Sequence, residues 1–325
     1  MLVNLKEKSL GLLFCLLVGV LIHYLGLISQ IPLMLIAILL GISMHSFIYN
    51  RDLQTGIDFT GNNVLKFAVG LIGLQLSIQD LAQLGLKSIF VLMLIVATTI
   101  FLGLVISKSL KLSQQFGLIS SSAIAICGAS AALAVTSVLP KNSKLARDTS
   151  VSIIIITLLS TLAMLVYPYL INWIIESDLG KSLFLGGSIH NVAHVVGAAY
   201  SLSDNIGEQA VLIKLIRVAF LIPVVFIIAN FASTSASTTN RAKLPWFLTL
   251  FALLLIVNSV ISIPETITSF FQKVSKFLLV TAMFAIGLKT NLKEIIEIGS
   301  KPILSMILLS LWVVLLLLVI IISFY

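Results

Sequence analysis

The sequence predicts an all-helical integral membrane protein, and three observations support that class. First, 59 % of the 325 residues are hydrophobic, only 10 % are charged, and the mean hydropathy is +1.16. Second, the apolar residues form continuous runs long enough to cross a bilayer as helices, whereas a transmembrane barrel would alternate apolar and polar residues. Third, the basic residues, which give a net charge of +8, lie in short links beside those runs. That placement is typical of a topology signal rather than of a nucleic-acid-binding surface.

We expect about eleven transmembrane helices in one transporter-like domain over residues 1–325, without a soluble domain. Ten is the nearest alternative, if residues 183–202 enter the membrane and return. The expected spans are Ser9–Ile28, Pro32–Tyr49, Val64–Ile78, Ser88–Ser107, Gln114–Leu139, Thr149–Trp173, Leu183–Leu202, Val211–Phe231, Pro245–Ile263, Phe277–Leu288 and Pro302–Phe324. A polar loop is expected at Asn50–Asn63, and a linker in water at Ser233–Lys243.

The first apolar run is interpreted as a membrane helix rather than a signal peptide, because no small-x-small cleavage site follows it. With eleven spans, twelve of the 20 lysine and arginine residues fall on the amino-terminal side of the membrane and eight on the other. Basic loops stay in the cytoplasm. We therefore expect a multi-pass protein of the bacterial plasma membrane with a cytoplasmic amino terminus.

The centre of Ser120–Leu139 is made of the small residues Cys127-Gly128-Ala129-Ser130. Glycine costs about 1 kcal/mol relative to alanine inside a helix, and serine competes for backbone hydrogen bonds. We expect two half-helices that meet near Gly128, the second presenting free N–H groups at mid-membrane depth with Ser130 as a possible cap. Transporters hold substrates at such sites. Close helix packing through small residues, without a break, is the alternative.

A second irregular stretch contains Ser188, His190, Asn191 and His194. The two histidines are four residues apart and share a helix face, a spacing that also suits zinc. A metalloprotease motif would need glutamate directly after the first histidine, where this chain has Asn191. Three alternatives remain: a metal site, two histidines hydrogen-bonded between helices, and a protonatable pair that lines a transport route.

The charges favour an anionic solute. No acidic residue falls at the centre of an expected span, although Asp148 lies near the start of one. A cation transporter usually needs a buried carboxylate. Lys214 and Arg217 instead reach into a span, three positions apart on one helix face. With two half-helix N-termini they predict an electropositive site; snorkelling to the membrane interface is the alternative for both.

The candidate substrate-binding residues are therefore Cys127, Gly128, Ala129, Ser130, Ser188, His190, Asn191, His194, Lys214 and Arg217.

An internal repeat relates Gly73–Leu81 to Gly287–Ile295. In the expected topology an odd number of spans separates the two copies, so they would point in opposite directions across the membrane. Inverted repeats of this kind are characteristic of secondary transporters. They predict approximate inverted halves at residues 32–175 and 180–325, unless the likeness only reflects the usual composition of links between spans.

Four motifs carry a resemblance to a known family. They are CGASAALAV from Cys127, SIHNVAHVVGAA from Ser188, KLIRVAFLIP from Lys214 and GLKTNLKEI from Gly287. In this order they resemble the YeiH-type family of multispanning bacterial membrane proteins, often labelled sulfate exporters, over nearly the whole chain. That family is grouped with the cation/proton antiporter and bile-acid symporter superfamily.

This resemblance implies inverted repeats of about five spans and two broken helices that cross near the midplane. One would be Ser120–Leu139, and the second either Leu183–Leu202 or Phe277–Leu288. Family members commonly carry Glu and Gln where this chain has Asn191 and His194. If that Glu couples protons in relatives, this chain has lost it or moved the task to histidine.

The sequence thus predicts a secondary transporter that exports a small anion, such as sulfate or a sulfonate, with proton coupling through histidine as an option. The alternative is a non-transporting regulatory or holin-like assembly protein of the membrane. No Walker motif, nucleophile elbow or redox cysteine pair appears, so an enzyme is not expected. The expected partners are a small anionic solute and the lipid bilayer, with a homodimer as a possible assembly. We expect no nucleic acid, cofactor or metal.

Overall fold

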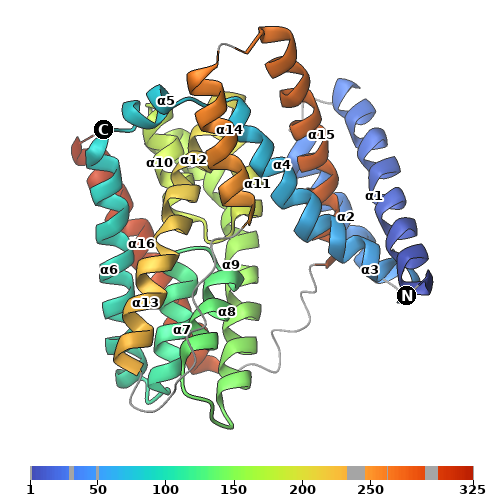
Figure 1. Ribbon diagram of the computed structural model, residues 1–325. Helices are drawn as coiled ribbons and strands as arrows, with labels where there is room; N and C mark the ends of the chain where they lie inside the picture. Colours follow the sequence, from blue (N-terminus) through green and yellow to red (C-terminus); the bar gives the residue numbers. More distant parts are fainter. Residues whose placement is uncertain are drawn as a thin grey trace. The chain divides into compact units, whose positions relative to one another are not determined.

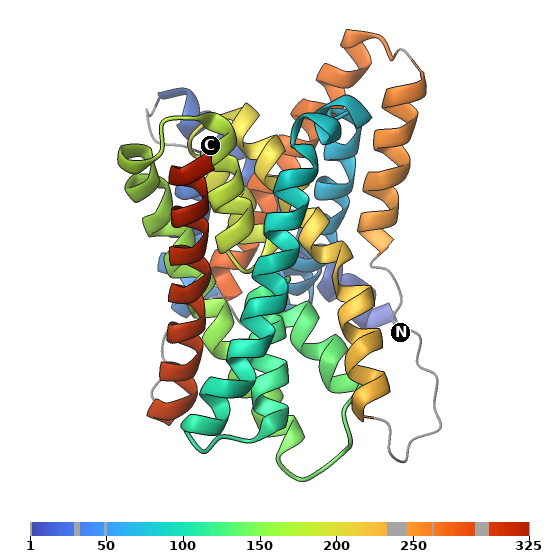
Figure 2. The same ribbon diagram turned by 90° about the vertical axis from the view of Figure 1, so that its left-hand side faces the viewer.

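The computed structural model describes residues 2–28, 33–48, 51–232, 246–261, 263–289 and 299–324, and every regular element in these ranges is a helix (Figure 1, Figure 2). The all-helical class is therefore confirmed. Tertiary contacts divide the chain into two compact units. Unit 1 comprises Met1–Gln83, Val196–Glu208 and Pro245–Asn291, and unit 2 comprises Leu84–Val195, Gln209–Leu244 and Leu292–Tyr325. The inverted relation between residues 32–175 and 180–325 stays a prediction.

Unit 1 combines helices from the amino-terminal quarter of the chain with two helices from its last third. They are α1 (Leu2–Ile28), α2 (Leu33–Ile48), α3 (Arg51–Phe59), the π-helical turn η1 (Thr60–Val64), α4 (Leu65–Leu71), the 3-10 turn η2 (Ile72–Leu74), α5 (Ile78–Gln83), α14 (Trp246–Val260) and α15 (Glu265–Lys289). Continuous apolar runs form α1, α2 and α14, because a bilayer leaves each backbone polar group to be paired within its own helix.

Glycines set the closest helix contacts in unit 1. The helices α2 and α15 run side by side (Figure 1), and a Cβ atom added to Gly41 would lie 2.8 Å from the Cα atom of Gly287. A Cβ atom added to Gly11 of α1 would lie 2.7 Å from the Cα atom of Gly56 on α3. Small residues are what allow membrane helices to approach at backbone distance.

The expected polar loop at Asn50–Asn63 is wrong in its described part, because Arg51–Phe59 is α-helical and Thr60–Val64 continues it as a π-helical turn. The polar residues mark one face of a helix rather than a loop. Ile57 and Thr60 are buried, whereas Asn62 and Asn63 are exposed. Packing of the buried face against α1 thus overrides the polar composition.

Unit 2 contains the interrupted helices. Its elements are α6 (Gly85–Ser109), α7 (Gln114–Ala125), α8 (Ala129–Val138), α9 (Leu145–Ile174), α10 (Asp178–Ser188), the start of α11 (Val192–Ala199), most of α12 (Asp204–Ala219), α13 (Leu221–Ala232) and α16 (Ser300–Phe324). The helices α6 and α16 lie side by side (Figure 2). Serine side chains cap two of these helices, because Ser113 accepts from Phe116 N and Ser177 accepts from Gly180 N.

Within the described ranges, five helices are long and apolar enough to cross a membrane. They are Gly85–Ser109, Leu145–Ile174, Asp204–Asn230, Glu265–Lys289 and Ser300–Phe324; shorter apolar helices occur at Ser9–Leu25, Leu33–His45, Ala129–Val138 and Trp246–Val260.

The structure also decides which of two segments is the second broken helix. Phe277–Leu288 belongs to the uninterrupted helix α15, which begins at Glu265, so that candidate is wrong. Leu183–Leu202 is interrupted between α10 and α11. The expected linker Ser233–Lys243 and the part of the second repeat copy from Thr290 to Ile295 lie outside the described residues.

Candidate functional site

The first helix break lies between α7 and α8, as the small residues around Gly128 predict. Ile126 leaves the helical region with φ −119° and ψ −84°, and Gly128 adopts φ +69° and ψ −129°, which glycine alone reaches without strain. Gly128 N donates to Ala123 O at 2.8 Å and closes α7, while Gly128 O accepts from Ala132 N at 3.1 Å and opens α8. The cap of α8 is therefore Gly128, which offers no side chain, and not Ser130.

The second break spans Ile189–Asn191, between α10 and α11. Asn191 begins α11, because its Oδ1 accepts from Ala193 N at 3.2 Å and its backbone O accepts from Val195 N at 3.0 Å. A Cβ atom added to Gly128 would lie 3.6 Å from His190 O, so the two breaks meet. Unit 2 therefore contains two interrupted helices whose interruptions are adjacent.

Arg217 on α12 joins the carboxyl-terminal ends of the two half-helices that lead into the breaks. Its Nε donates to Ala125 O at 3.0 Å, and its Nη2 donates to Ile124 O at 3.0 Å and to Ala125 O at 2.5 Å. Its Nη1 donates to Gly187 O and, at 3.4 Å, to Gly186 O. The last carbonyls of a helix lack partners within it and carry partial negative charge. The buried guanidinium supplies these carbonyls with hydrogen-bond donors and with a compensating positive charge.

Lys214 lies about one turn before Arg217 on α12 and also donates to a backbone carbonyl at a helix break. Its Nζ donates to Ile189 O at 2.7 Å, inside the second break, and the side chain is fully buried, as is that of Arg217. Burial rules out snorkelling for both residues. Their shared helix face is confirmed, but the contacts described are with backbone carbonyls, so direct binding of a solute stays a prediction.

Glycine at position 186 explains how α12 comes within reach of α10. A Cβ atom added to Gly186 would lie 2.5 Å from Ala210 O of α12. The neighbouring Gly187 faces α16, where an added Cβ atom would lie 2.9 Å from the side chain of Leu317. Close packing of α10 thus brings its final carbonyls to the basic side chains of α12.

Both histidines are buried and hydrogen-bonded to other helices. His190 Nδ1 lies 3.2 Å from Ile124 O on α7, and its Nε2 lies 3.1 Å from Ser310 Oγ on α16. His194 Nε2 lies 3.1 Å from Thr161 Oγ1 on α9. Among the described residues, no group of three or more His, Cys, Asp or Glu side chains could hold a metal ion. These contacts favour the alternative of histidines hydrogen-bonded between helices.

The remaining predicted site residues differ in exposure. Cys127 is buried with a free thiol, Ala129 and Asn191 are half-buried, and Ser130 is exposed in the first turn of α8. The buried Ser188 donates to Phe184 O of its own helix at 2.7 Å.

Three site residues escaped the sequence reasoning: Ser160 and Thr161 on α9, and Ser310 on α16. Ser160 Oγ accepts from Asn191 N at 3.1 Å and thereby fixes the start of α11. The signal was available, because each is a hydroxyl in the middle of an apolar run. Hydroxyls inside membrane helices commonly bond across to a neighbour.

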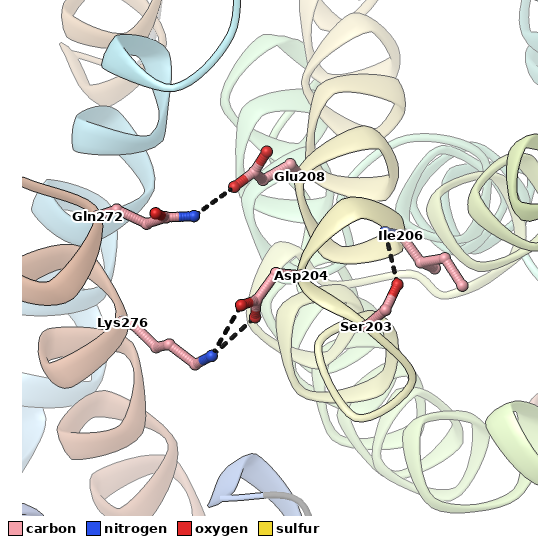
Figure 3. Close-up of polar contacts among 6 residues, drawn as sticks. All are labelled: Ser203, Asp204, Ile206, Glu208, Gln272 and Lys276. Carbon is pink, nitrogen blue, oxygen red and sulfur yellow. Dashed lines mark hydrogen bonds and ion pairs between the residues drawn. The ribbon is translucent and has the colours of Figure 1, made fainter. Parts of the chain in front are cut away.

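A second group of polar contacts lies in unit 1 and engages the acidic residues at the start of α12 (Figure 3). Lys276 Nζ lies 2.8 and 3.0 Å from the two carboxylate oxygens of Asp204, and Gln272 Nε2 donates to Glu208 Oε1 at 3.1 Å. The side chains of the ion pair are 39 % and 49 % exposed, so it contributes about 0–1 kcal/mol of stability. Within unit 1 these carboxylates therefore bond to α15, and because Asp204 is exposed and Glu208 half-buried, they do not form a buried cation site.

The model of a family described as conserved hypothetical protein 698 matches residues 10–306. The chain belongs to this family. Among its relatives is a UPF0324 membrane protein of Chlorobaculum tepidum, which is 39 % identical over 282 residues covering 85 % of this chain and 78 % of the relative. The UPF0324 membrane protein TauZ of Paracoccus denitrificans is 37 % identical over 279 residues, 84 % of this chain and 82 % of its own. The resemblance carried by the four motifs is confirmed, and this UPF0324 protein is a membrane protein.

One solved structure covers 98 % of this UPF0324 chain and 99 % of its own: that of the sodium proton antiporter MjNhaP1 from Methanocaldococcus jannaschii at pH 8. The sequence identity is 13 % and the TM-score is 0.31. A likeness of this size carries no argument about fold or function.

Proposed function

We propose that this UPF0324 protein is a secondary transporter that carries a small anion across the plasma membrane. The observation that carries the proposal is the meeting of two helix breaks around buried basic side chains in unit 2. Irregular backbone at membrane depth is tolerated where it is buried in protein or faces a water-filled cavity. Transporters use discontinuous helices to bind solutes there.

The balance of charge at the breaks supports an anion. Each helix end carries roughly half an elementary charge, so the carboxyl-terminal ends of α7 and α10 together supply about one negative charge. With both side chains protonated, Lys214 and Arg217 supply two positive charges, and no carboxylate is among the buried side chains of the described residues. The starts of α8 and α11 add further positive potential. The site therefore has a net positive charge that a bound anion would neutralise.

The start of α8 is the best place for the anion itself. Arg217 compensates the end of α7, whereas α8 follows a glycine cap without a side chain, and in its first turn the Ala131 N–H and the Ser130 hydroxyl reach the neutral sulfur of Cys127 rather than a charged group. The exposed Ser130 adds a hydroxyl in the same turn. Backbone N–H groups at a helix start bind sulfate-like oxyanions and carboxylates, so we propose sulfate, a sulfonate or a related anion as solute, with Cys127, Gly128, Ala129 and Ser130 lining the route.

The proposal includes a cytoplasmic amino terminus, no enzymatic activity and a homodimer as a possible assembly. A screen of thermal stability tests the function, because a ligand that binds only the folded state raises the apparent stability by about 2.7 kcal/mol at 100 times its dissociation constant. Purified protein is heated with sulfate, sulfite, sulfonates or carboxylates at constant ionic strength, and with their common counter-ion as control. Saturable stabilisation by one class of anion is expected. Stabilisation by none would favour a regulatory or holin-like protein.

A further inference from the structure

His194 has a hydrogen-bond acceptor that the fold leaves open. Thr161 Oγ1 donates its single proton to Thr157 O at 2.9 Å, so it must accept from His194 at the 3.1 Å contact with Nε2. The neutral ring is therefore protonated on Nε2 and carries a lone pair on Nδ1. Nδ1 has no hydrogen-bond partner within the described part of the chain, and the residue is 1 % exposed.

The other histidine at the breaks differs. A carbonyl only accepts, so His190 donates from Nδ1 to Ile124 O, and its Nε2 accepts from Ser310. Both nitrogens of His190 are thus used. Hydroxyls without a described partner also occur in unit 2, at Thr99, Ser107, Ser122 and Ser305. A helical hydroxyl can turn toward a carbonyl of its own helix, whereas an imidazole cannot, so the open acceptor of His194 calls for a donor from elsewhere.

We propose that His194 Nδ1 accepts a hydrogen bond from a donor group on the transported anion. The residue lies in the first turn of α11, directly after a break that meets the cap of α8. The N–H groups of α8 would hold the anionic oxygens, and His194 would select anions that also carry a hydroxyl or ammonium group. Within the proposed class of solutes, fully ionised sulfate, which has acceptors only, would therefore bind more weakly than a sulfonate that carries such a donor. This inference rests on the proposed transport of an anion.

Two matched solutes test it: ethanesulfonate, which lacks a donor, and 2-hydroxyethanesulfonate, which has one. Wild-type protein should bind the hydroxylated solute about fivefold more tightly, the size of one neutral hydrogen bond. His194→Gln keeps an N–H near Nε2 for Thr161 but loses the acceptor at Nδ1, so it should bind both solutes equally. His194→Asn places its Oδ1 near the position of Nδ1 and should restore part of the preference. His23→Gln, at an exposed position, should behave as wild type.

The outcomes separate two failures. Binding of neither sulfonate, nor of any other small anion, would overturn the proposed function and this inference with it. Binding of both with equal affinity by wild type, or an unchanged preference in His194→Gln, would overturn only the role of His194. If the variants do not fold, nitrogen-15 NMR of the wild-type imidazoles gives the answer. The hydroxylated solute should shift the Nδ1 resonance of an Nε2-protonated His194, and ethanesulfonate should not; equal shifts would contradict the inference.

Discussion

Gly128 combines a backbone requirement with open space. Its φ of +69° excludes other residues without strain, yet the nearest atom to an added Cβ, His190 O, lies 3.6 Å away. The glycine is therefore needed for the path of the chain at the break rather than for room, and the proposed route of the solute follows that path.

Replacing Gly128 by alanine should lower the free energy of unfolding by about 1–3 kcal/mol through backbone strain. Gly85→Ala is the matched control, because Gly85 has φ +70° and nothing within 4 Å of an added Cβ, but begins α6. Both variants should lose thermal stability in detergent to a similar extent, and only Gly128→Ala should also lose anion binding. If both variants bound the anion equally well, the break at Gly128 would have no part in binding the solute.

Arg217 has a structural role that its position in the sequence conceals. Its partners Ala125 and Gly187 are 92 and 30 positions away along the chain. An apolar span with a basic residue indicates a special site, but it does not reveal that the partners are helix ends.

Arg217→Lys should destabilise the protein by at least about 3 kcal/mol, because a single ammonium cannot replace a planar fork that donates to two half-helices. Arg147→Lys, at an exposed position on α9, is the control and should be neutral. Thermal midpoints in detergent measure both. A stable Arg217→Lys with weakened anion binding alone would instead assign Arg217 to the solute.

At the scale of elements, glycine contacts fix how the helices of unit 1 pack. Gly287 illustrates this, since a residue that the sequence places near a suspected break proves to be a packing position in an unbroken helix. The pattern of apolar residues cannot tell a glycine that breaks a helix from a glycine that allows two helices to pack closely. In both cases the sequence shows only a residue without a side chain.

Gly287→Ala should cost about 3 kcal/mol, because the added Cβ would lie 2.4 Å from Ile38 O and backbone atoms would have to move. Gly61→Ala is the control: its nearest contact, with Ile286, would be 3.4 Å and ordinary. Thermal midpoints of the two variants should differ clearly. Similar midpoints would mean that α2 and α15 are free to separate.

At the scale of the whole molecule, the sequence was sufficient for the class, for the long apolar helices α6, α9 and α16 and for the break at Gly128, but the expected span Val64–Ile78 is made of short helical pieces. Long apolar runs and a cluster of small residues are local signals. It was insufficient for α3, whose polar face resembles a loop, and for the start of α15, where Glu265 and the polar residues after it hide twelve residues of helix. It could not reveal the two units either, because each is assembled from three separate segments.

Counterflow in proteoliposomes tests the central claim most directly. Vesicles are loaded with an unlabelled sulfonate, and uptake of the same sulfonate in labelled form is followed at zero net gradient of other ions. The account predicts a transient accumulation of label with wild-type protein and none with Gly128→Leu, whose larger side chain should block the break while the protein still inserts. Wild-type vesicles that match protein-free vesicles for every anion, or full activity of Gly128→Leu, would contradict it.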